Sequence, residues 1–553
     1  MSSSRTVNGL YTPYLRDCPE NIEPIEATIE GQVPTWLSGC FLSNGSGGFK
    51  FGSNKYQHFF DGPALLRKFT IKNGRIVFEA KYLDTETLRQ NRKHNRIIVT
   101  EFGTRGYPDP CKTIFERLEN FFLMKDLFND NDQVTFWNIS DQLYAVGETP
   151  KITQIDQKNL ETLKRVDLRD IISISTAAAH VHTDRDGNIF AMGNTINNYN
   201  IVRVQKSDSH PSGLDLTIVG RIPVSRPLSP SYYHSFCITE RFFVFIEQPL
   251  VLSVPSLLWE HYSGGTNSRI MNWRPEFGTQ IHLLNREDGS IWPIVYQSGP
   301  FAFFHTINAY EDDDHVVVDI CCYRDAGILR TLTAEAMQKA SSSREEAMRQ
   351  AELAKSQAMR FVLPLHPGSP VDEKRKSATN LNHLKYSQSS AYFVSKYASQ
   401  VNIIPEPLTT NGPVMAEMPT INYLKNGQKY RYFYALRRRQ KDLLLQLMKC
   451  DTLKKRQKIW FQNDYYPSEP IFVPKPGSTE EDDGVVLSYV VSEVDEHDGF
   501  LLLLDGISFQ EIGRARFRAS SSHLIPQFHA IFLPDHGLQH STDSHPPEHT
   551  HTH

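Results

Sequence analysis

The sequence predicts an all-β protein, and a β-propeller is the architecture that fits it best. The first observation is a series of Asn-Gly and Asp-Gly pairs between apolar or alternating segments, a pattern typical of tight turns between antiparallel strands. These pairs lie at residues 73–74, 186–187, 288–289, 426–427, 483–484 and 498–499, so they run through the whole chain. The second observation is the length of 553 residues, because many short hairpins leave few exposed edges when they close around an axis. The third is that helix signals are few.

The clearest hairpin is LRKFTIKNGRIVFEAKYL at residues 65–82. Residues 333–361 are instead rich in Ala, Met, Glu and Lys, and Ser343 with Glu346 matches a capping box. We therefore expect a helical insertion there, outside the sheets and without a catalytic part. No WD or kelch period is present, so any repeat is structural and is not written in the sequence.

Two segments are candidates for contact with a membrane surface. Residues 111–128 interleave apolar and charged side chains and predict an amphipathic helix, which either lies on a bilayer or packs on the propeller. Residues 249–262 are a second candidate patch. Cys111 is either a plain thiol or a site of lipid attachment.

The composition excludes several classes of protein. A net charge of −4 gives no reason to expect nucleic acid, and the basic run RRRQK at residues 437–441 is expected to be a solvated loop. The seven cysteines are odd in number and irregularly spaced, which favours a reducing compartment. We see no signal peptide and no apolar run of ~20 residues, so we expect a cytoplasmic protein that associates peripherally with membranes.

The last eighteen residues hold six histidines and are expected to form a disordered tail.

Four histidines share an unusual setting. Each lies at or beside a predicted strand, among small or aromatic residues, and each comes from a different hairpin: His180, His234, His305 and His529. A single one of them is most simply a core histidine bonded to a carbonyl group. The ring nitrogens of four such histidines close together are hard to supply with partners unless a metal is bound. Neutral imidazoles favour Fe, Zn or Cu over Mg or Ca.

Three glutamates in apolar company are candidates to support such a centre, because metal-bound histidines usually donate their second N–H to an acceptor. They are Glu148, Glu417 and Glu469. Alone, each is more simply explained as a strand-end or loop acid, and spacing does not assign them to particular histidines.

A resemblance connects these residues. The chain is similar to the carotenoid cleavage oxygenase family, which includes the animal β-carotene dioxygenases and the retinoid isomerase group. The motifs that carry it are HFFDGPALLRKF, IIVTEFGT, PDPCKTIFERL, PSYYHSF, FHTINAYED, VDICCY, RFVLPL, YPSEPIFVP and EEDDGVVLS. Residues 83–118 look most like the carotenoid isomerooxygenase group of insects. The similarity implies a seven-bladed propeller over residues 34–534, with residues 1–33 as an N-terminal extension, a helical or loop cap, and a tail at 535–553.

The resemblance also implies roles for the residues. It makes the four histidines ligands of Fe(II), with His182 outside the ligand set, and it makes the three glutamates the acceptors that orient three of the rings. Four aromatic side chains match positions near the family site and are candidates for a substrate tunnel: Phe60, Phe102, Phe304 and Phe528. Three departures from the family pattern are Gly147 in place of Thr, Val181 in place of Pro and Ala530 in place of Gly, and they leave room for altered chemistry.

The implied function is insertion of O2 across the central 15,15′ double bond of a carotenoid, giving retinal-type aldehydes. The substrate would be a xanthophyll or a carotene. The insect-like similarity further implies that one half is isomerised from trans to 11-cis, as in visual chromophore production. Three alternatives remain open: a symmetric or eccentric dioxygenase without isomerisation, a retinoid ester isomerohydrolase, and a non-catalytic carotenoid-binding propeller.

Overall fold

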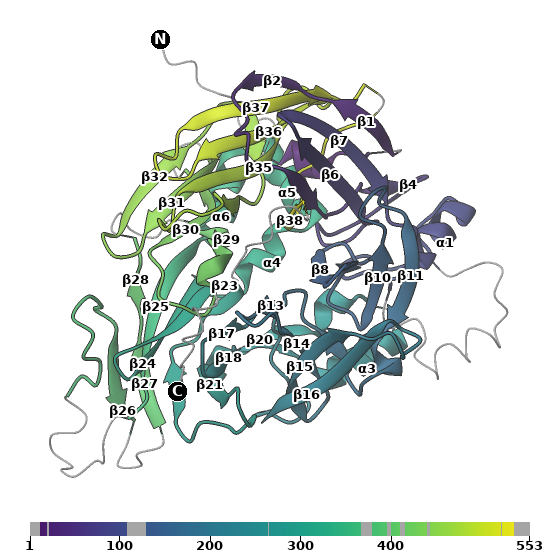
Figure 1. The fold of residues 1–553 in the computed structure, drawn as a ribbon. Coiled ribbons are helices and arrows are strands. Elements are labelled where there is room, and N and C mark those ends of the chain that lie inside the picture. The colour runs from purple at the N-terminus through teal and green to yellow at the C-terminus, as the bar shows by residue number, and fades with distance from the viewer. Residues whose placement is uncertain are drawn as a thin grey trace, which may run out of the picture.

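Seven β-sheets surround a central axis in the computed structural model (Figure 1). It describes residues 11–18, 21–107, 129–263, 265–366, 379–394, 400–409, 415–439, 443–520 and 522–535. The sequence prediction of a seven-bladed β-propeller is confirmed. The expected helix at 111–128 and the tail beyond residue 535 lie outside the described residues.

Each sheet forms one blade. Blade 1 contains β1 (Ile22–Glu26), β3 (Gly39–Ser43), β6 (Leu65–Lys72), β7 (Arg75–Tyr82) and β38 (Ala530–Pro534). Blade 2 contains β8 (Thr135–Ile139), β9 (Gln142–Val146), β10 (Lys151–Ile155) and β11 (Thr162–Asp167). Blade 3 contains β12 (Thr176–Ala177), β13 (His182–Thr183), β14 (Ile189–Asn194), β15 (Asn198–Lys206) and β16 (Leu214–Pro223). Blade 4 contains β17 (Cys237–Ile238), β18 (Phe242–Glu247), β21 (Thr279–Asn285), β22 (Val295–Ser298), β26 (Ser390–Phe393) and β27 (Gln400–Ile404).

Blade 4 includes one parallel pair, β22 with β27, whereas the remaining blades are antiparallel. Blade 5 contains β23 (Ala302–Asp312), β24 (His315–Tyr323), β25 (Ser356–Pro364) and β28 (Glu406–Pro407). Blade 6 contains β29 (Glu417–Ile421), β30 (Tyr432–Arg438), β31 (Leu445–Asp451) and β32 (Arg456–Trp460). Blade 7 contains β2 (Thr28–Gly31), β33 (Tyr465–Pro467), β34 (Ile471–Pro474), β35 (Gly484–Ser492), β36 (Asp498–Asp505) and β37 (Glu511–Arg518). Two short ribbons lie outside the blades, β4 (Lys50–Phe51) with β5 (Asn54–Lys55) and β19 (Leu250–Leu252) with β20 (Met271–Trp273).

The two ends of the chain close the ring together. C-terminal β38 pairs with β3 in blade 1, and N-terminal β2 pairs with β37 in blade 7. Between these blades the rings of Phe78 and Phe517 stack with their centroids 4.0 Å apart. The expected N-terminal extension at residues 1–33 is therefore too long, because β1 and β2 already belong to blades. These strands were missed because neither shows the alternation of apolar and polar residues that marks a half-buried strand.

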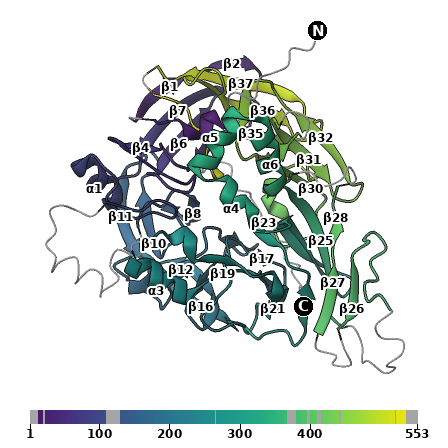
Figure 2. The same cartoon turned by 180° about the vertical axis from the view of Figure 1, so that it is seen from behind.

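Helices cover one end of the propeller axis (Figure 2). They are α4 (Gly327–Thr331), α5 (Ala334–Ser342) and α6 (Arg344–Leu353), while α1 (Glu86–His94) and α3 (Val254–Ser263) lie further out. Ser343 is the N-cap of α6, since the Glu346 N–H donates to its hydroxyl. The expected capping box is only half formed, because the Glu346 carboxylate bonds Arg349 and Gln350. The expected insertion at 333–361 ends too late, because Ser356–Pro364 is strand β25. Short 3-10 helices are η1 (Thr12–Leu15), η2 (Leu168–Asp170), η3 (Asn267–Ile270), η4 (Pro275–Phe277) and η5 (Tyr423–Lys425).

The turn predictions have mixed outcomes. Asn73 and Gly74 both adopt positive φ and join β6 to β7 as a two-residue turn. Asp498-Gly499 was wrongly expected to be a turn, because it begins strand β36. Glycine avoids close contacts there, because a Cβ atom on Gly499 would lie 2.7 Å from a methyl group of Leu524 and 3.0 Å from the Val490 carbonyl oxygen. Among the described helices, none combines the length and the apolar character that crossing a bilayer requires.

Candidate metal centre

Four imidazole rings meet on the propeller axis. The Nε2 atom of His234 lies 3.0 Å from that of His180 and 3.1 Å from that of His305. The Nε2 atoms of His305 and His529 are 3.3 Å apart, and the four potential ligand atoms all lie within 4.8 Å of one another. The structure thus brings together the four histidines that the sequence singled out.

A carboxylate lies behind three of these rings. His234 Nδ1 is 2.6 Å from Glu148, His305 Nδ1 is 2.5 Å from Glu417, and His529 Nδ1 is 2.9 Å from Glu469. The fourth ring, His180, packs edge-on against His529 with ring centroids 4.4 Å apart. His182 lies apart from the cluster and bonds through Nε2 to the Phe236 carbonyl oxygen at 2.7 Å.

The seven blades each contribute one residue to this centre. His529, Glu148 and His180 come from blades 1 to 3, His234 and His305 from blades 4 and 5, and Glu417 and Glu469 from blades 6 and 7. Most of them lie on or next to the strands closest to the axis, such as β17, β23, β29 and β38 (Figure 1). Closure of the ring therefore assembles groups that are far apart in the sequence.

Irregular backbone geometry orients two of these side chains, those of His305 and Glu417. In β23, Phe304 and His305 together oppose the single residue Cys321 of β24, which is a β-bulge. In β29 the register shifts after Glu417, and Met418 takes a left-handed φ of 53° although a proline follows it. Such a conformation is strained for this residue. It places the Met418 N–H 3.1 Å from the Glu417 carboxylate.

The donor set fits a transition-metal cation. Since each carboxylate accepts the Nδ1 proton of its ring, the Nε2 atoms of His234, His305 and His529 carry lone pairs that face one another at the axis. Burial, followed by the neighbouring imidazoles, lowers the pKa of His180 and of His305 well below 6.5. Both rings are therefore neutral at pH 7, and lone pairs in such close contact repel one another unless a cation lies between them.

Burial also raises the pKa of the Glu417 carboxyl to about 8, although the neighbouring Tyr323 hydroxyl and the Met418 N–H oppose this. A cation bound at the Nε2 atom of His305 would favour the ionised carboxylate behind that ring. The negative charge of the carboxylate and the positive charge of the metal would therefore stabilise each other across the imidazole ring.

The centre opens into a cavity of about 730 Å³, and His234, His305 and His529 lie in its wall. All four tunnel candidates also line it. Phe60 lies at its middle, with ring centroids 5.8 Å from Phe102, 5.9 Å from Phe528 and 6.4 Å from Phe304. Phe304 is in turn 6.0 Å from His234. The aromatic side chains therefore form one continuous wall beside the imidazoles.

Several residues of the site were not recognised in the sequence. The Tyr232 hydroxyl donates to Glu148 at 2.7 Å, and Tyr323 and Met418 surround Glu417. A signal existed for Tyr232, which lies two residues before His234 in PSYYHSF. Met418 likewise follows Glu417 directly in β29. Tyr323 carries no comparable sign, because it reaches Glu417 from the neighbouring blade.

The basic run at residues 437–441 was wrongly expected to be a solvated loop. Arg437 and Arg438 are the last residues of β30, and Arg438 lines the cavity. Its guanidinium lies 5.3 Å from the Tyr11 ring centroid and donates to the Leu443 carbonyl oxygen at 3.1 Å. Residues 440–442 lie outside the described residues.

The departures from the family pattern leave the geometry intact. Gly147 lines the cavity, and a Cβ atom added to it would meet Asp132 at an ordinary 3.6 Å. Val181 packs against the core between blades 2 and 3. The Ala530 N–H donates to Glu469 at 2.7 Å, so this carboxylate holds both the ring of His529 and the next peptide group.

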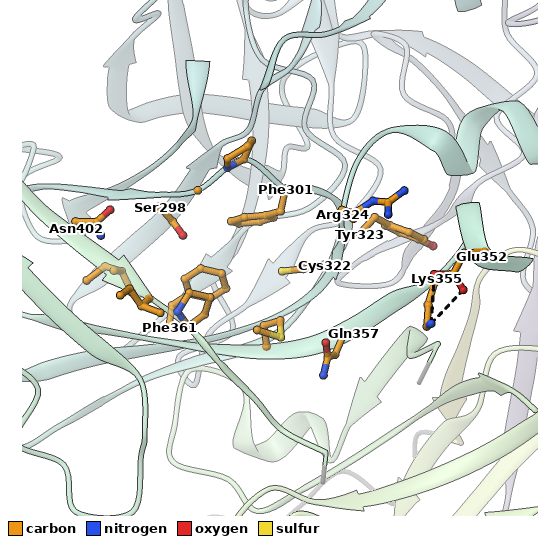
Figure 3. Close-up of a pocket in the computed structure, with 16 residues that line it drawn as sticks. Ser298, Phe301, Cys322, Tyr323, Arg324, Glu352, Lys355, Gln357, Phe361 and Asn402 are labelled. Carbon is orange, nitrogen blue, oxygen red and sulfur yellow. Dashed lines mark hydrogen bonds and ion pairs between the residues drawn. The ribbon is translucent and has the colours of Figure 1, made fainter. Parts of the chain in front are cut away.

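A second cavity of about 490 Å³ lies between blades 4 and 5 (Figure 3). Phe301 and Phe361 form part of its wall, and the Lys355–Glu352 ion pair lies at one end. Only Tyr323 lines both cavities among the described residues. None of the histidines or acids of the centre lines the second cavity.

Fold and site together define a β-propeller protein with an axial four-histidine centre suited to a transition metal. Residues 15–534 match the family model described as retinal pigment epithelial membrane protein. The chain belongs to this family, which is the carotenoid oxygenase family that the sequence resembled. The predictions of the family and of an enzyme are thereby confirmed.

Curated relatives are similar over nearly the whole chain. The mitochondrial carotenoid-cleaving dioxygenase of Mustela putorius furo is 36% identical, covering 94% of this chain and 96% of the relative. The β,β-carotene 15,15′-dioxygenase of Rattus norvegicus is 35% identical, with 94% and 91% covered. The carotenoid isomerooxygenase of Galleria mellonella is 35% identical, with 94% and 96% covered. A cobalt-substituted form of the Synechocystis oxygenase has a TM-score of 0.71 at 20% identity, with 95% and 98% of the chains covered, which supports the fold.

Proposed function

We propose that the protein is a non-haem Fe(II) dioxygenase that cleaves a carotenoid at its central 15,15′ double bond into two retinal-type aldehydes. The observation that carries this proposal is the set of four convergent imidazoles in the wall of a cavity lined by aromatic side chains. The names of the rat and ferret relatives support the substrate class.

We assign one metal ion to His180, His234, His305 and His529. Four imidazoles without a carboxylate ligand suit Fe, Zn or Cu. Reaction with O2 requires a redox-active ion, which excludes Zn, and membership of the carotenoid oxygenase family favours Fe over Cu. When bound, iron would supply the activation of O2, which amino-acid side chains do not perform unaided. Glu148, Glu417 and Glu469 hold three of the rings in the tautomer that directs Nε2 to the axis.

The remaining residues position the substrate and exclude water. Phe60, Phe102, Phe304 and Phe528 offer flat apolar faces against which a polyene can lie. The cap residues Leu332 and Met337 also line the cavity and cover it from the side of α4 and α5. An apolar cavity of this kind can fix which double bond lies beside the imidazoles and limit the access of water to reactive species.

We further propose that substrate enters from a membrane surface beside α3. Leu257 and Leu258 of this helix line the cavity, and Leu258, Trp259 and Tyr262 are 56%, 64% and 73% exposed. An exposed apolar face at the edge of a cavity is suited to insertion into the headgroup region of a bilayer. Residues 249–262 thus remain our candidate for peripheral membrane contact on the cytoplasmic side. Because the ferret relative is named mitochondrial, fractionation of cells with organelle markers tests the compartment.

A finer proposal is that cleavage is coupled to trans-to-11-cis isomerisation of one half of the polyene. It is supported by the Galleria relative, which is named carotenoid isomerooxygenase. Rotation requires a lowered bond order during cleavage, and the shape of the cavity would select the product. Chromatography that separates 11-cis from all-trans retinal-type aldehydes tests this step separately from cleavage.

One experiment separates the candidate functions: carotenoid is incubated with iron-loaded protein under air and under argon. Aldehydes formed only under air support the dioxygenase. Conversion of a retinyl ester without O2 would support an isomerohydrolase instead. Bound pigment that stays unchanged under air would support a carotenoid-binding propeller and would overturn the proposal.

A further inference from the structure

A second group of metal-ligating side chains lies away from the axis, on the outer loops of blade 7. Glu496 and His497 belong to the turn between β35 and β36, and His523 follows β37. His523 Nε2 is 3.1 Å from a Glu496 carboxylate oxygen, and His497 Nε2 is 3.9 Å from the same oxygen. One potential ligand atom from each residue lies within 4.8 Å of the other two.

The backbone fixes the tautomer of the His497 ring. Its Nδ1 atom lies 2.9 Å from the Ala519 carbonyl oxygen and 3.1 Å from that of Ser522, and because both oxygens are acceptors, Nδ1 carries the proton. The Nε2 atom of the neutral ring then presents a lone pair to Glu496 and His523. A carbonyl group bonded to the second nitrogen is the arrangement that orients metal-bound histidines in proteins.

The two loops are held in place without a metal. The Leu524 N–H donates to the Glu496 carbonyl oxygen at 2.7 Å, and the Ala519 N–H donates to that of His497 at 3.0 Å. From the inner side, the Arg16 guanidinium donates to the Leu524 carbonyl oxygen at 3.2 Å and to that of Glu493 at 2.8 Å. The ligand-bearing backbone is thus preorganised, which reduces the entropy lost on binding.

We infer that Glu496, His497 and His523 form a surface site for a divalent cation of the zinc class. Two imidazoles and one carboxylate suit Zn²⁺ better than Mg²⁺ or Ca²⁺. The three side chains are 47%, 27% and 36% exposed, so solvent reaches the site and water can complete the coordination. The bound ion would tie the β35–β36 turn to the segment that leads from β37 to His529. This inference is independent of the carotenoid chemistry.

The test is calorimetric titration of Zn²⁺ into the full-length, iron-loaded protein. In every sample the six histidines after residue 535 are replaced by glutamine, because they would bind zinc themselves. We expect one zinc ion per chain, and we expect His523→Gln to weaken its binding by at least ~10-fold, since a ligand matters at least as much as its outer hydrogen-bond partner. His523→Gln is chosen because the Nδ1 atom of His497 also holds a loop, so replacing His497 would disturb the fold.

The matched control is His366→Gln, because His366 is an exposed histidine paired with one carboxylate, Asp314, at 2.6 Å. It should leave zinc binding unchanged. Crystals soaked in Zn²⁺ should show an anomalous peak between Glu496, His497 and His523. Equal zinc binding by the parent protein and His523→Gln, or no binding by either, would mean that Glu496 and His523 form only an ion pair and would overturn the inference.

Discussion

Each carboxylate that supports a histidine is itself held by another group. Tyr232 donates to Glu148, the Met418 N–H to Glu417, and the Ala530 N–H to Glu469. Orientation of the imidazoles therefore extends outward through two successive hydrogen bonds. A change at the acid should act on the metal although it leaves all four nitrogen ligands in place.

We predict that Glu469→Gln lowers iron affinity by ~10–100-fold, because an amide keeps only one acceptor oxygen, whereas Glu469 accepts from both the His529 ring and the Ala530 N–H. Iron content after dialysis against a chelator measures this. The control is Glu247→Gln, since Glu247 also contacts a buried histidine, His282 at 3.3 Å, but lies away from the axis. Equal iron retention by the two variants would contradict the assigned role.

A second prediction about a single residue concerns Gly147. A Cβ atom fits there without a close contact, so we expect Gly147→Thr to fold and to bind iron. If its methyl group narrows an open coordination position, the variant should slow oxidation of the bound ferrous iron by air when no carotenoid is present. Optical detection of ferric iron over time measures the rate, and Gly147→Ala serves as the smaller control. An unchanged rate would show that residue 147 does not limit access of O2.

At the scale of elements, a buried ion pair within blade 5 is also bonded by a tyrosine of blade 6. Arg360 of β25 bonds Asp319 of β24 through two nitrogen atoms, at 2.9 and 2.7 Å, and Tyr430, next to β30 of blade 6, donates to the same acid at 2.6 Å. We expect Asp319→Ala to lower the free energy of unfolding by ~3–5 kcal/mol, because Arg360 is then left buried without its partner. Denaturant titration tests this. Glu240→Ala removes the exposed partner of Arg185 and should cost at most ~1 kcal/mol.

Helix α3 gives a prediction about membrane contact. Its exposed face carries Leu258 and Trp259, so Leu258→Asp with Trp259→Asp should weaken sedimentation with phospholipid vesicles. Turnover of carotenoid dissolved in detergent should change much less than turnover of carotenoid supplied in vesicles. Exposed Leu453, on a turn of blade 6, offers Leu453→Asp as a control. If the α3 variant sediments as the parent protein does, entry beside α3 is wrong.

Local sequence predicted some elements well and others poorly. Asn73-Gly74 located a hairpin because two successive residues of positive φ are rarely tolerated elsewhere. Asp498-Gly499 was wrongly predicted to be a turn, because its glycine avoids a close contact with Leu524. Leu524 lies 25 residues further along the chain, so the local sequence does not show this contact. Residues 356–361, the first part of strand β25, were taken as helical because Gln357, Ala358 and Met359 continue the helix-favouring composition of the segment before them.

At the scale of the whole molecule, the candidate site is a consequence of ring closure. The four histidines could be singled out because polar rings in apolar strand surroundings are rare, whereas their pairing with Glu148, Glu417 and Glu469 required the resemblance to a family. Tyr323 and Arg438 were not found, because no local pattern records which blade lies beside which. The propeller fold follows from many weak local signals, but the contacts at its axis depend on how the blades close.

Acid should destabilise the whole protein. Burial lowers the pKa of His58 and of His182 to about 4. Both remain neutral in the folded state but bind protons in the unfolded chain below pH 6.5, so their contribution is present above that pH and is lost between 6.5 and 4. Each adds a slope of up to ~1.4 kcal/mol per pH unit to the free energy of unfolding. Denaturant titrations from pH 7 to 5 should show a shallower slope for His58→Gln, and not for the exposed control His366→Gln.

The most direct measurement is the iron-to-protein ratio after anaerobic loading with ferrous ion and removal of the excess. The account predicts a ratio near one for the parent protein and for His182→Ala, whose imidazole lies outside the cluster. It predicts a ratio near zero for His180→Ala, His234→Ala, His305→Ala and His529→Ala. If these four variants keep their iron while remaining folded, the imidazoles at the axis do not form the metal centre.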